Sequence, residues 1–144
     1  MARRDLLVRL AATKDRRAIS ACDPSVAREL NRRELIDSAI AARQCWVVER
    51  GGAVAGYGVL TTNFFARDFV ALLFVAEAHR RNGVGNAILE TVEQARRGDR
   101  LFTSTSESNL AMRALLTSRH YEPSGTILNL DPADAELVFV KFLR

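Results

Sequence analysis

The chain has few of the residues that form disulfides, metal sites or membrane spans. It contains only two cysteines, Cys22 and Cys45, and two histidines, so neither a disulfide framework nor a zinc site is expected. No apolar run is long enough to cross a membrane, and the short apolar start is interrupted by Arg9 and lacks the pattern of a signal peptide. These absences predict a cytoplasmic protein that binds no metal and does not enter a membrane.

Size and charge narrow the class of protein further. A hydrophobic fraction of 48% in 144 residues is enough for one core and too little for two, so residues 1–144 are predicted to form a single domain. Lysine and arginine number 21 against 17 aspartates and glutamates, which gives a net charge of +4. This excess suits a small polyanionic ligand and also permits nucleic acid, although no nucleic-acid motif is present. Charge alone therefore does not distinguish a small polyanionic ligand from nucleic acid.

The most informative segment is a glycine-containing turn between an apolar run and an amphipathic run. The turn has the pattern R-x-x-G-x-G, with Arg80, Gly83 and Gly85, and apolar residues then recur at helical spacing over residues 84–95. The first N–H groups of a helix lack intrahelical acceptors and lie at the positive end of its dipole, so this turn favours an anion. It has neither the Gly-Lys-Ser/Thr end of a Walker A loop nor the third glycine of a dinucleotide fingerprint, where Ile88 stands. A phosphate-binding turn of another kind is predicted.

Segment 75–85 resembles the acyl-CoA pyrophosphate loop of the GNAT superfamily, the Gcn5-related N-acetyltransferases. Arg80, Gly83 and Gly85 fill the positions of the family motif Q/R-x-x-G-x-G/A, and the other predicted elements follow in GNAT order over nearly the whole chain. The resemblance implies an α/β fold with a mixed, mostly antiparallel sheet of about seven strands, flanking helices and splayed central strands. It also implies acetyl-CoA as co-substrate, with the pantetheine arm between the splayed strands.

The same resemblance assigns the acetyl-CoA contacts to three places. Backbone groups near the end of the central strand would bind the pantetheine arm, and the amides of residues 81–86 would bind the pyrophosphate beside two arginines. Asn109 matches an asparagine that many family members place near the pantetheine, and it is equally well placed to cap the following helix. The predicted contacts are Phe74, Val75, Arg80, Arg81, Asn82, Gly83, Val84, Gly85, Asn86 and Asn109.

Local patterns predict the element order β, α, α, β, β, β, α, β, α, β, β. Asp23 and Pro24 start a helix whose apolar stripe runs to about residue 42, with Arg33 and Asp37 spaced for an ion pair one turn apart. The predicted strands are 5–10, 45–49, 54–60, 69–75, 100–106, 126–130 and 137–143, with a tight turn at 51–52 and a helix that begins at residue 108 or 109.

The residues that would move protons are less clearly marked. Many GNAT enzymes carry a glutamate early on the central strand, but residues 69–73 contain no carboxylate, and Asp68 is the nearest acid. Leu116 stands in place of the tyrosine that usually protonates the leaving thiolate, so Ser106 and Tyr121 are the candidates to replace it. Each of the three candidates also has a structural explanation. Asp68 would be a solvated loop residue, and Ser106 and Tyr121 would be strand-end or core residues. A thiol with a pKa of about 8.5 leaves readily as its thiolate, so catalysis without the tyrosine is feasible.

The leading hypothesis is an N-acetyltransferase that moves the acetyl group of acetyl-CoA directly to a primary amine of an unidentified acceptor. Two alternatives stay open. Leu116 and the acid-free strand favour an acyl-CoA-binding module without turnover, and the arginines near the N-terminus favour a transferase that acts on aminoacyl-tRNA. A homodimer is also compatible with the sequence. The aromatic residues that could belong either to the core or to an acceptor pocket are Trp46, Tyr57, Phe64 and Phe65.

Overall fold

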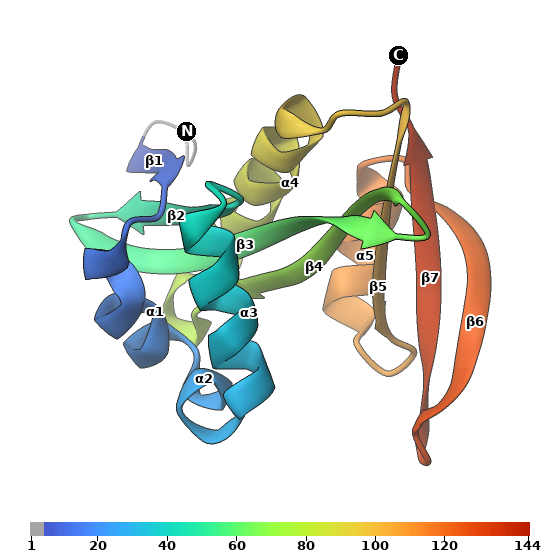
Figure 1. Cartoon of the computed structure of the whole chain (residues 1–144), viewed down its shortest axis with the longest axis horizontal. Coiled ribbons are helices and arrows are strands. Elements are labelled where there is room, and N and C mark those ends of the chain that lie inside the picture. The colour runs from blue at the N-terminus through green and yellow to red at the C-terminus, as the bar shows by residue number, and fades with distance from the viewer. Residues whose placement is uncertain (1–4) are drawn as a thin grey trace.

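A computed structural model describes residues 5–144 and shows a seven-stranded sheet with helices on both faces (Figure 1). The spatial order is β1-β2-β3-β4-β5-β7-β6, and every neighbouring pair is antiparallel except β4 and β5, which run parallel. The predicted mixed, mostly antiparallel sheet is therefore confirmed. The strands are β1 Leu6–Leu10, β2 Cys45–Arg50, β3 Ala53–Phe64, β4 Arg67–Val75, β5 Arg100–Ser106, β6 Glu122–Asp131 and β7 Asp134–Phe142.

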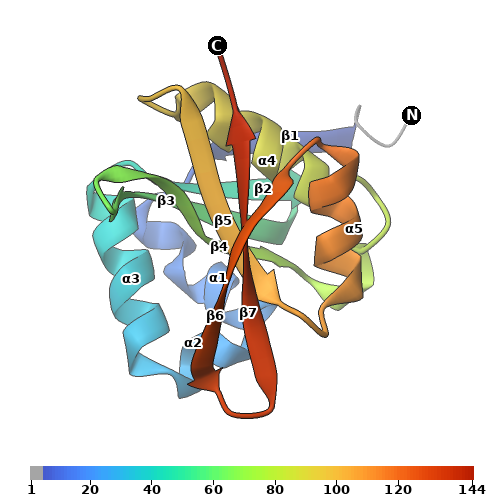
Figure 2. The ribbon, with the colours of Figure 1, turned by 90° about the vertical axis from the view of Figure 1, so that its right-hand side faces the viewer.

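Two groups of helices cover opposite faces of this sheet (Figures 1 and 2). Ile88 and Leu89 of the fourth helix pack with Leu101 of β5 on one face, and Ile19 and Val26 pack with β2 and β3 on the other. Each such buried side chain contributes about 1.5–3 kcal/mol, so both helix layers are firmly held. No helix in residues 5–144 is long and apolar enough to cross a membrane. The helices are α1 Arg16–Cys22, α2 Pro24–Arg28 and α3 Leu30–Ala41 on one face, and α4 Val84–Ala95 and α5 Leu110–Ser118 on the other.

The N-terminal helices differ from the single helix predicted after Asp23. The predicted order has two helices between the first two strands, whereas residues 5–144 form three there, α1, α2 and α3, because the backbone leaves the helical conformation at Glu29 (φ −116°, ψ 106°) and divides the helix predicted from Asp23. Asp23 caps α2 as predicted, since its carboxylate accepts from Ser25 N at 3.0 Å. The same buried carboxylate accepts from the Tyr57 hydroxyl at 2.6 Å and from Arg32 at 2.9 Å. α2 is thus tied to α3 and β3 by contacts that local sequence does not reveal.

The predicted ion pair between Arg33 and Asp37 is wrong. Arg33 Nη1 donates to the carbonyl oxygens of Val26 at 3.1 Å and Ala27 at 2.6 Å, near the end of α2. Asp37 pairs instead with Arg16 of α1, at 2.8 Å. The last carbonyls of a helix lack intrahelical donors, and Arg33 satisfies two of them. Both side chains therefore hold α3 to its neighbours rather than to itself.

The β2–β3 turn matches the prediction, and the β3–β4 connection does not. Gly51 and Gly52 have φ of +60° and +80°, as a two-residue hairpin turn requires. β3 does not end near residue 60 but continues to Phe64, and the turn consists of Phe65 and Ala66 with φ of 51° and 62°. Positive φ at two consecutive residues other than glycine is uncommon, so the sequence carried no sign of this turn.

The four aromatic candidates for an acceptor pocket divide between core and surface. Trp46 and Tyr57 are buried in the two cores, which confirms one of their two explanations. The ring of Phe64 stacks on Phe69 with ring centroids 4.5 Å apart, and Phe65 is 86% exposed at the tip of the hairpin. These two residues lie at the end of the β3–β4 hairpin, outside both cores.

β6 forms one edge of the sheet and is exposed along its whole length (Figure 2). β6 and β7 are longer than the predicted strands 126–130 and 137–143, because pairing continues to Glu122 opposite Val140 and to Asp131 opposite Asp134. Polar residues in an exposed edge hairpin do not follow the alternation that predicts strands. The additional length of β6 and β7 therefore could not be predicted from the sequence.

A buried ionic cluster joins α4, α5 and β7. Glu93 is 6% exposed, and its carboxylate accepts hydrogen bonds from Arg119 at 2.7 and 3.1 Å, from the Tyr121 hydroxyl at 2.9 Å and from Lys141 at 3.1 Å. Burial raises the pKa of Glu93, but the three donors together outweigh burial and hold the pKa below its ordinary value. A lowered pKa means that the ionised carboxylate stabilises the fold above the pH at which the unfolded group titrates. That stability is lost as the pH falls through the folded pKa.

Glu93→Gln is expected to lower the free energy of unfolding by about 3 kcal/mol at neutral pH, because Arg119 and Lys141 lose their counter-charge. The deficit should shrink as the pH falls below the ordinary glutamate pKa of about 4.3 and through the lower folded pKa, where the wild-type carboxylate also becomes protonated. Urea unfolding of both proteins across this pH range measures the effect. Tyr121→Phe removes one neutral donor and serves as the control, with an expected loss of about 1 kcal/mol. A Glu93→Gln deficit that does not vary with pH contradicts this explanation.

Candidate functional site

β4 and β5 are paired at only one end. The parallel ladder joins residues 68–70 of β4 to residues 101–103 of β5. Thr103 Oγ1 donates to Val70 O at 3.1 Å, and the ladder stops there. Residues 72–75 then pair only with β3, and residues 104–106 pair only with β7. Two backbone edges therefore part without pairing and can receive an extended chain.

A β-bulge explains why the two strands part. In the β3–β4 register, Val59 lies opposite Leu72 and Leu60 lies opposite Val70, so Ala71 has no partner. A bulge bends its strand and increases the local twist. Because this one directly follows the last β4–β5 pair, it turns the end of β4 away from β5. The splayed central strands that the resemblance implied are present.

Phe74 and Val75 lie on the unpaired part of β4. The Phe74 ring packs toward α1–α3, with its centroid 6.2 Å from that of Tyr57, and Val75 packs toward α4. Their backbone pairs with β3 on one side only. A chain that enters between the parted strands would meet both residues, so the position suits the predicted pantetheine contact, which stays a prediction.

The turn after β4 leaves a run of amides available for an anion. A short 3-10 turn, Glu77–His79, follows the strand, and Gly83 (φ +80°, ψ 10°) precedes the first residue of α4. The first amide of α4 with a backbone acceptor is Ala87 N, which donates to Gly83 O at 3.0 Å. Within residues 5–144, the amides of residues 81–86 have no hydrogen-bond acceptor. They lie at the positive end of the helix dipole, where an anion is stabilised.

Side chains of the turn hold it in this shape. Asn82 Nδ2 donates to the carbonyl oxygens of His79 at 3.2 Å and Arg80 at 2.9 Å. Arg80 Nε donates to Val75 O at 3.3 Å, which ties the turn to the end of β4. Arg81 has a φ of 65°, an uncommon conformation for arginine. The Asn82 side chain thus braces the turn, and its backbone N–H is the group left for a ligand.

Gly85 of α4 packs against Leu115 of α5. A Cβ at this position would be 2.9 Å from Leu115 Cδ2, so the end of the Leu115 side chain would have to shift. One turn further along α5, Arg119 Nη1 donates to Asn86 Oδ1 at 2.8 Å. The second glycine of the motif therefore serves helix packing, and this packing brings α5 to the first turn of α4.

Asn109 caps α5, since its Oδ1 accepts a hydrogen bond from Met112 N at 3.1 Å. This confirms the capping explanation for Asn109. The Asn109 side chain is exposed. The residue lies in the short connection that leads from the end of β5 into the first turn of α5. A contact between Asn109 and acetyl-CoA stays a prediction.

The comparison with known proteins decides the family. The model of the acetyltransferase (GNAT) family matches residues 14–121, most of the chain. The chain belongs to the GNAT family. An acetyltransferase of the GNAT family from Bacillus cereus ATCC 10987 is 28% identical to it, with 96% of this chain and 98% of that chain covered and a TM-score of 0.89. No curated protein matches the chain.

Two more distant GNAT-like structures share the fold. yncA from Salmonella typhimurium, whose structure contains acetyl-CoA as its cofactor, is 17% identical over 97% of this chain and 95% of that chain, with a TM-score of 0.78. The ribosomal-protein-S18-alanine N-acetyltransferase from Escherichia coli is 16% identical over 96% of this chain and 94% of that chain, with a TM-score of 0.76. At such low identity the likeness concerns the fold alone.

As a GNAT acetyltransferase, the protein uses acetyl-CoA as its acetyl donor, and the prediction of an acetyl-CoA-dependent enzyme is confirmed. The residues of the turn fit the diphosphate of this donor, because free amides stand beside the Arg80 and Arg81 side chains. Amides and arginines of this kind recognise phosphate oxygens. The chemistry of the turn and the family assignment therefore agree.

Asp68 is not a solvated loop residue. It lies in β4, is 5% exposed, and its Oδ2 accepts from Arg97 N at 3.0 Å and Gly98 N at 2.8 Å. These contacts hold the connection between α4 and β5. Asp68 also lies opposite Leu101, on the joined part of the two strands and away from their unpaired edges. Its position favours a structural role over that of the predicted base.

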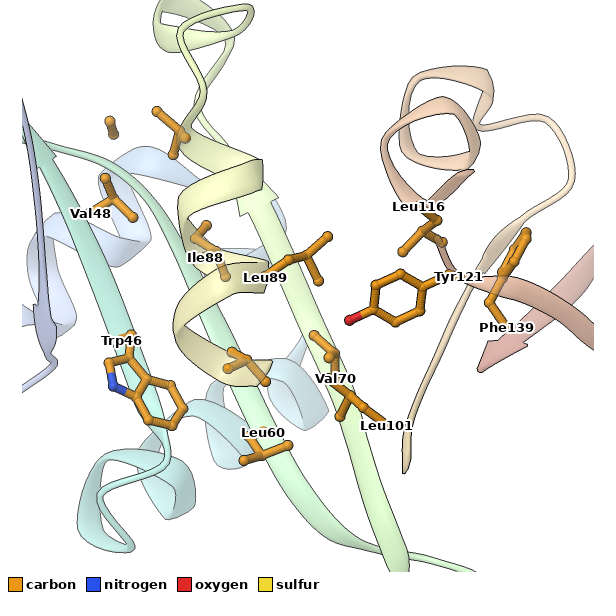
Figure 3. Close-up of a cluster of buried hydrophobic side chains, with 13 residues drawn as sticks. Trp46, Val48, Leu60, Val70, Ile88, Leu89, Leu101, Leu116, Tyr121 and Phe139 are labelled. Atoms are coloured by element: carbon orange, nitrogen blue, oxygen red, sulfur yellow. The ribbon is translucent and has the colours of Figure 1, made fainter. Parts of the chain in front are cut away.

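Tyr121 and Leu116 both belong to the core between the sheet and the α4–α5 layer (Figure 3). Leu116 is fully buried. The Tyr121 hydroxyl points toward α4 and donates to Glu93 Oε2 at 2.9 Å, and burial together with this carboxylate raises the pKa of Tyr121. A buried phenol whose proton is held by a carboxylate is a poor acid for a departing thiolate. Tyr121 is thus a core residue, which confirms its structural explanation.

Ser106 and a glutamate that the sequence analysis missed lie together beyond the end of the β4–β5 ladder. Ser106 ends β5 opposite Glu136 of β7, and alternation with buried Thr105 places its side chain on the sheet face opposite α5. Glu136 lies on that same face, and its Oε2 accepts from Ser104 Oγ at 2.7 Å. Ser104 directly follows Thr103, where the ladder ends, so this carboxylate lies beside the parting strands. The sequence indicated Glu136 only weakly, as an acidic residue that shares one face of β7 with Val138 and Val140.

His120 has a φ of 69° just after the end of α5. A left-handed conformation costs an ordinary residue about 1–2 kcal/mol, partly offset by the greater freedom of glycine in the unfolded chain. His120→Gly is therefore expected to raise the free energy of unfolding by about 0.5–1 kcal/mol. Denaturant unfolding measures the change, and His120→Ala, which keeps the strain, should bring no gain.

Proposed function

We propose that this GNAT acetyltransferase transfers the acetyl group directly to a primary amine. The observation that carries the proposal is the end of the β4–β5 ladder at Val70 and Thr103, next to a turn with free amides. The amides would hold the diphosphate, and the unpaired backbone edges would hold the extended arm. When bound, acetyl-CoA supplies an acetyl group activated as a thioester. The leaving group is the CoA thiol, which has a pKa of about 8.5 and can therefore leave as a thiolate. Holding donor and acceptor in one geometry is a major source of rate enhancement.

The acceptor is proposed to approach from the sheet face opposite α4 and α5. On the donor face, α4 and α5 pack on β4 and β5. On the opposite face, the Phe69 and Phe102 rings flank the joined part of the strands, and Ser104, Ser106 and Glu136 line the part where they separate. This face combines the two apolar rings with the Glu136 carboxylate, which suits an ammonium group carried on an apolar or uncharged chain.

Glu136 is the group that we assign as the proton acceptor. An amine with a pKa of about 10.4 is protonated at neutral pH and must lose a proton before its lone pair can attack. One ammonium proton passes to the Glu136 carboxylate, directly or through one water. The nitrogen then forms a bond to the acetyl carbon, the carbon–sulfur bond breaks, and the departing thiolate takes up the second nitrogen proton through the Ser106 hydroxyl or water and leaves as the free thiol. Ser104 holds the carboxylate in place at 2.7 Å. Ser106, opposite Glu136, remains the candidate donor to the thiolate.

An acyl-CoA-binding module without turnover is the competing function. It is favoured by Leu116, a buried apolar residue at the position of the family acid, and by Tyr121, the candidate substitute, whose buried hydroxyl is bound to Glu93. Release of the free thiol from acetyl-CoA should be measured over small amines, peptides with free N-termini, lysine peptides and aminoacyl-tRNA. Turnover with one of these classes is expected. Tight acetyl-CoA binding, seen as a thermal shift, with no thiol release over the whole panel would favour the module.

A further inference from the structure

Arg119 connects the buried cluster around Glu93 to the phosphate-binding turn. Its Nε and Nη2 donate to the two carboxylate oxygens of Glu93 at 3.1 and 2.7 Å, and its Nη1 donates to Asn86 Oδ1 at 2.8 Å. The Arg119 side chain is 15% exposed. Asn86 belongs to the first turn of α4, among the amides that have no acceptor. The guanidinium group of Arg119 therefore binds α4 at two residues, Asn86 and Glu93, that are seven positions apart.

This grip determines which way the Asn86 carboxamide is turned. A carboxamide has one acceptor oxygen and one donor nitrogen, and arginine can only donate. Because Arg119 takes the oxygen, Nδ2 must point away from Arg119, and both of its hydrogens stay available. Asn86 follows Gly85 in the motif, so its side chain leaves the helix beside the free amides of the same turn. A neutral side chain is thereby held as a donor next to an anion site.

We propose that Arg119 is a positioning residue that aims Asn86 Nδ2 at the diphosphate of acetyl-CoA. The Arg119 nitrogens that face Glu93 are occupied by its carboxylate, which Lys141 shares, so Arg119 meets the turn through its contact with Asn86 Oδ1. The three hydrogen bonds that Arg119 donates, two to Glu93 and one to Asn86, keep its side chain in one rotamer, whereas Tyr121 and Lys141 bind Glu93 without touching Asn86. Orientation is thus transmitted from the core to the turn. The proposal rests on acetyl-CoA binding and not on the acceptor or on Glu136, so it can fail or hold independently of the proposed transfer.

Asn86→Asp separates this role from a purely structural one. The aspartate keeps an oxygen for Arg119, so the fold and the Arg119 contact are retained, but the donor is replaced by a second anionic oxygen. We expect the Kd for CoA, measured by calorimetry, to rise about tenfold in Asn86→Ala and further in Asn86→Asp, with thermal stability of the aspartate variant unchanged or higher. Asn86→Asp that binds CoA as tightly as wild type overturns the proposal.

The coupling between the two residues gives a second test. Arg119→Met should weaken CoA binding severalfold in the wild-type background and have little further effect in the Asn86→Ala background. Arg119→Lys keeps a cation beside Glu93 but cannot bridge both partners, so it should weaken CoA binding as Arg119→Met does while destabilising the fold less. Lys141→Met, which removes a Glu93 partner that does not touch Asn86, is the matched control and should bind CoA normally.

Steady-state kinetics distinguish positioning from general damage. The variants of Arg119 and Asn86 should raise KM for acetyl-CoA and leave kcat at saturating donor unchanged, because the contact to the diphosphate does not change during transfer. Equal losses of stability in Arg119→Lys and Lys141→Met with unchanged CoA affinity in both would show that Arg119 only supports the fold. Additive effects of the Asn86 and Arg119 substitutions on the Kd would likewise overturn the proposal.

Discussion

Glu136→Gln is expected to lower kcat for amine acetylation by about a hundredfold at neutral pH, since general-base catalysis contributes about 10²–10⁴. The amide keeps the size of the side chain and can still accept from Ser104 Oγ, which lies 2.7 Å from Glu136 Oε2 in the wild-type protein. It cannot take the proton of the attacking ammonium. KM for acetyl-CoA should stay unchanged, because Glu136 lies on the face opposite the donor helices.

The control for this substitution is Glu122→Gln in the neighbouring strand. Glu122 is exposed in β6 and lies opposite Val140, so it belongs to the same hairpin as Glu136 but is remote from the β5 edge. It should retain wild-type kcat and KM. A steeper pH dependence of kcat in the wild type than in Glu136→Gln would support the assignment, whereas full activity of Glu136→Gln would show that the proton leaves by another route.

Gly83→Val is expected to weaken CoA binding at least tenfold. Gly83 has a φ of +80°, and a Cβ built on it approaches only Leu6 Cδ1, at 4.0 Å. Space is therefore not the obstacle, and the cost comes from the backbone, because a left-handed conformation costs an ordinary residue about 1–2 kcal/mol and is worse for a β-branched one. The turn can relieve this strain only by moving the amides of residues 81–86, and about 1.4 kcal/mol corresponds to tenfold in Kd.

A matched control exists in the same protein. Gly52 also has a φ of +80°, and a Cβ there would meet no atom within 4 Å, but it lies in the β2–β3 turn. Gly52→Val should lose a similar amount of stability and bind CoA as wild type does. Comparable CoA affinity in Gly52→Val and Gly83→Val, measured by calorimetry on folded protein, would mean that the turn after β4 is not the diphosphate site.

The sequence predicted the phosphate-binding turn and the strands beside it because the relevant signals are local. Arg80, Gly83 and Gly85 are close together in the chain, and the N-terminus of α4 follows directly. The apolar run of β4 and the bounds of β5, Arg100–Ser106, follow from local hydrophobicity. The tight turn at Gly51 and Gly52 likewise depends only on its own residues.

Elements that depend on distant partners were predicted less well. The break at Glu29 follows from the docking of α2 on β3 through Asp23 and Tyr57, which are far apart in the chain. The Phe65–Ala66 turn is held by the pairing of β3 with β4 on both of its sides. Asp68 looked like a loop residue because the sequence does not show that the α4–β5 connection folds back onto it.

The sequence by itself determined the family, the acetyl donor and the turn that we propose for its diphosphate, since those depend on backbone groups displayed by a few consecutive residues. Only the tertiary structure decided which side chains lie near that turn and near the parted strands. The bulge at Ala71 ends one strand pairing, the β5–β7 register brings Glu136 beside it, and the close packing at Gly85 lets Arg119 reach Asn86. Each of these contacts joins segments that meet only when the sheet register and the helix packing are established.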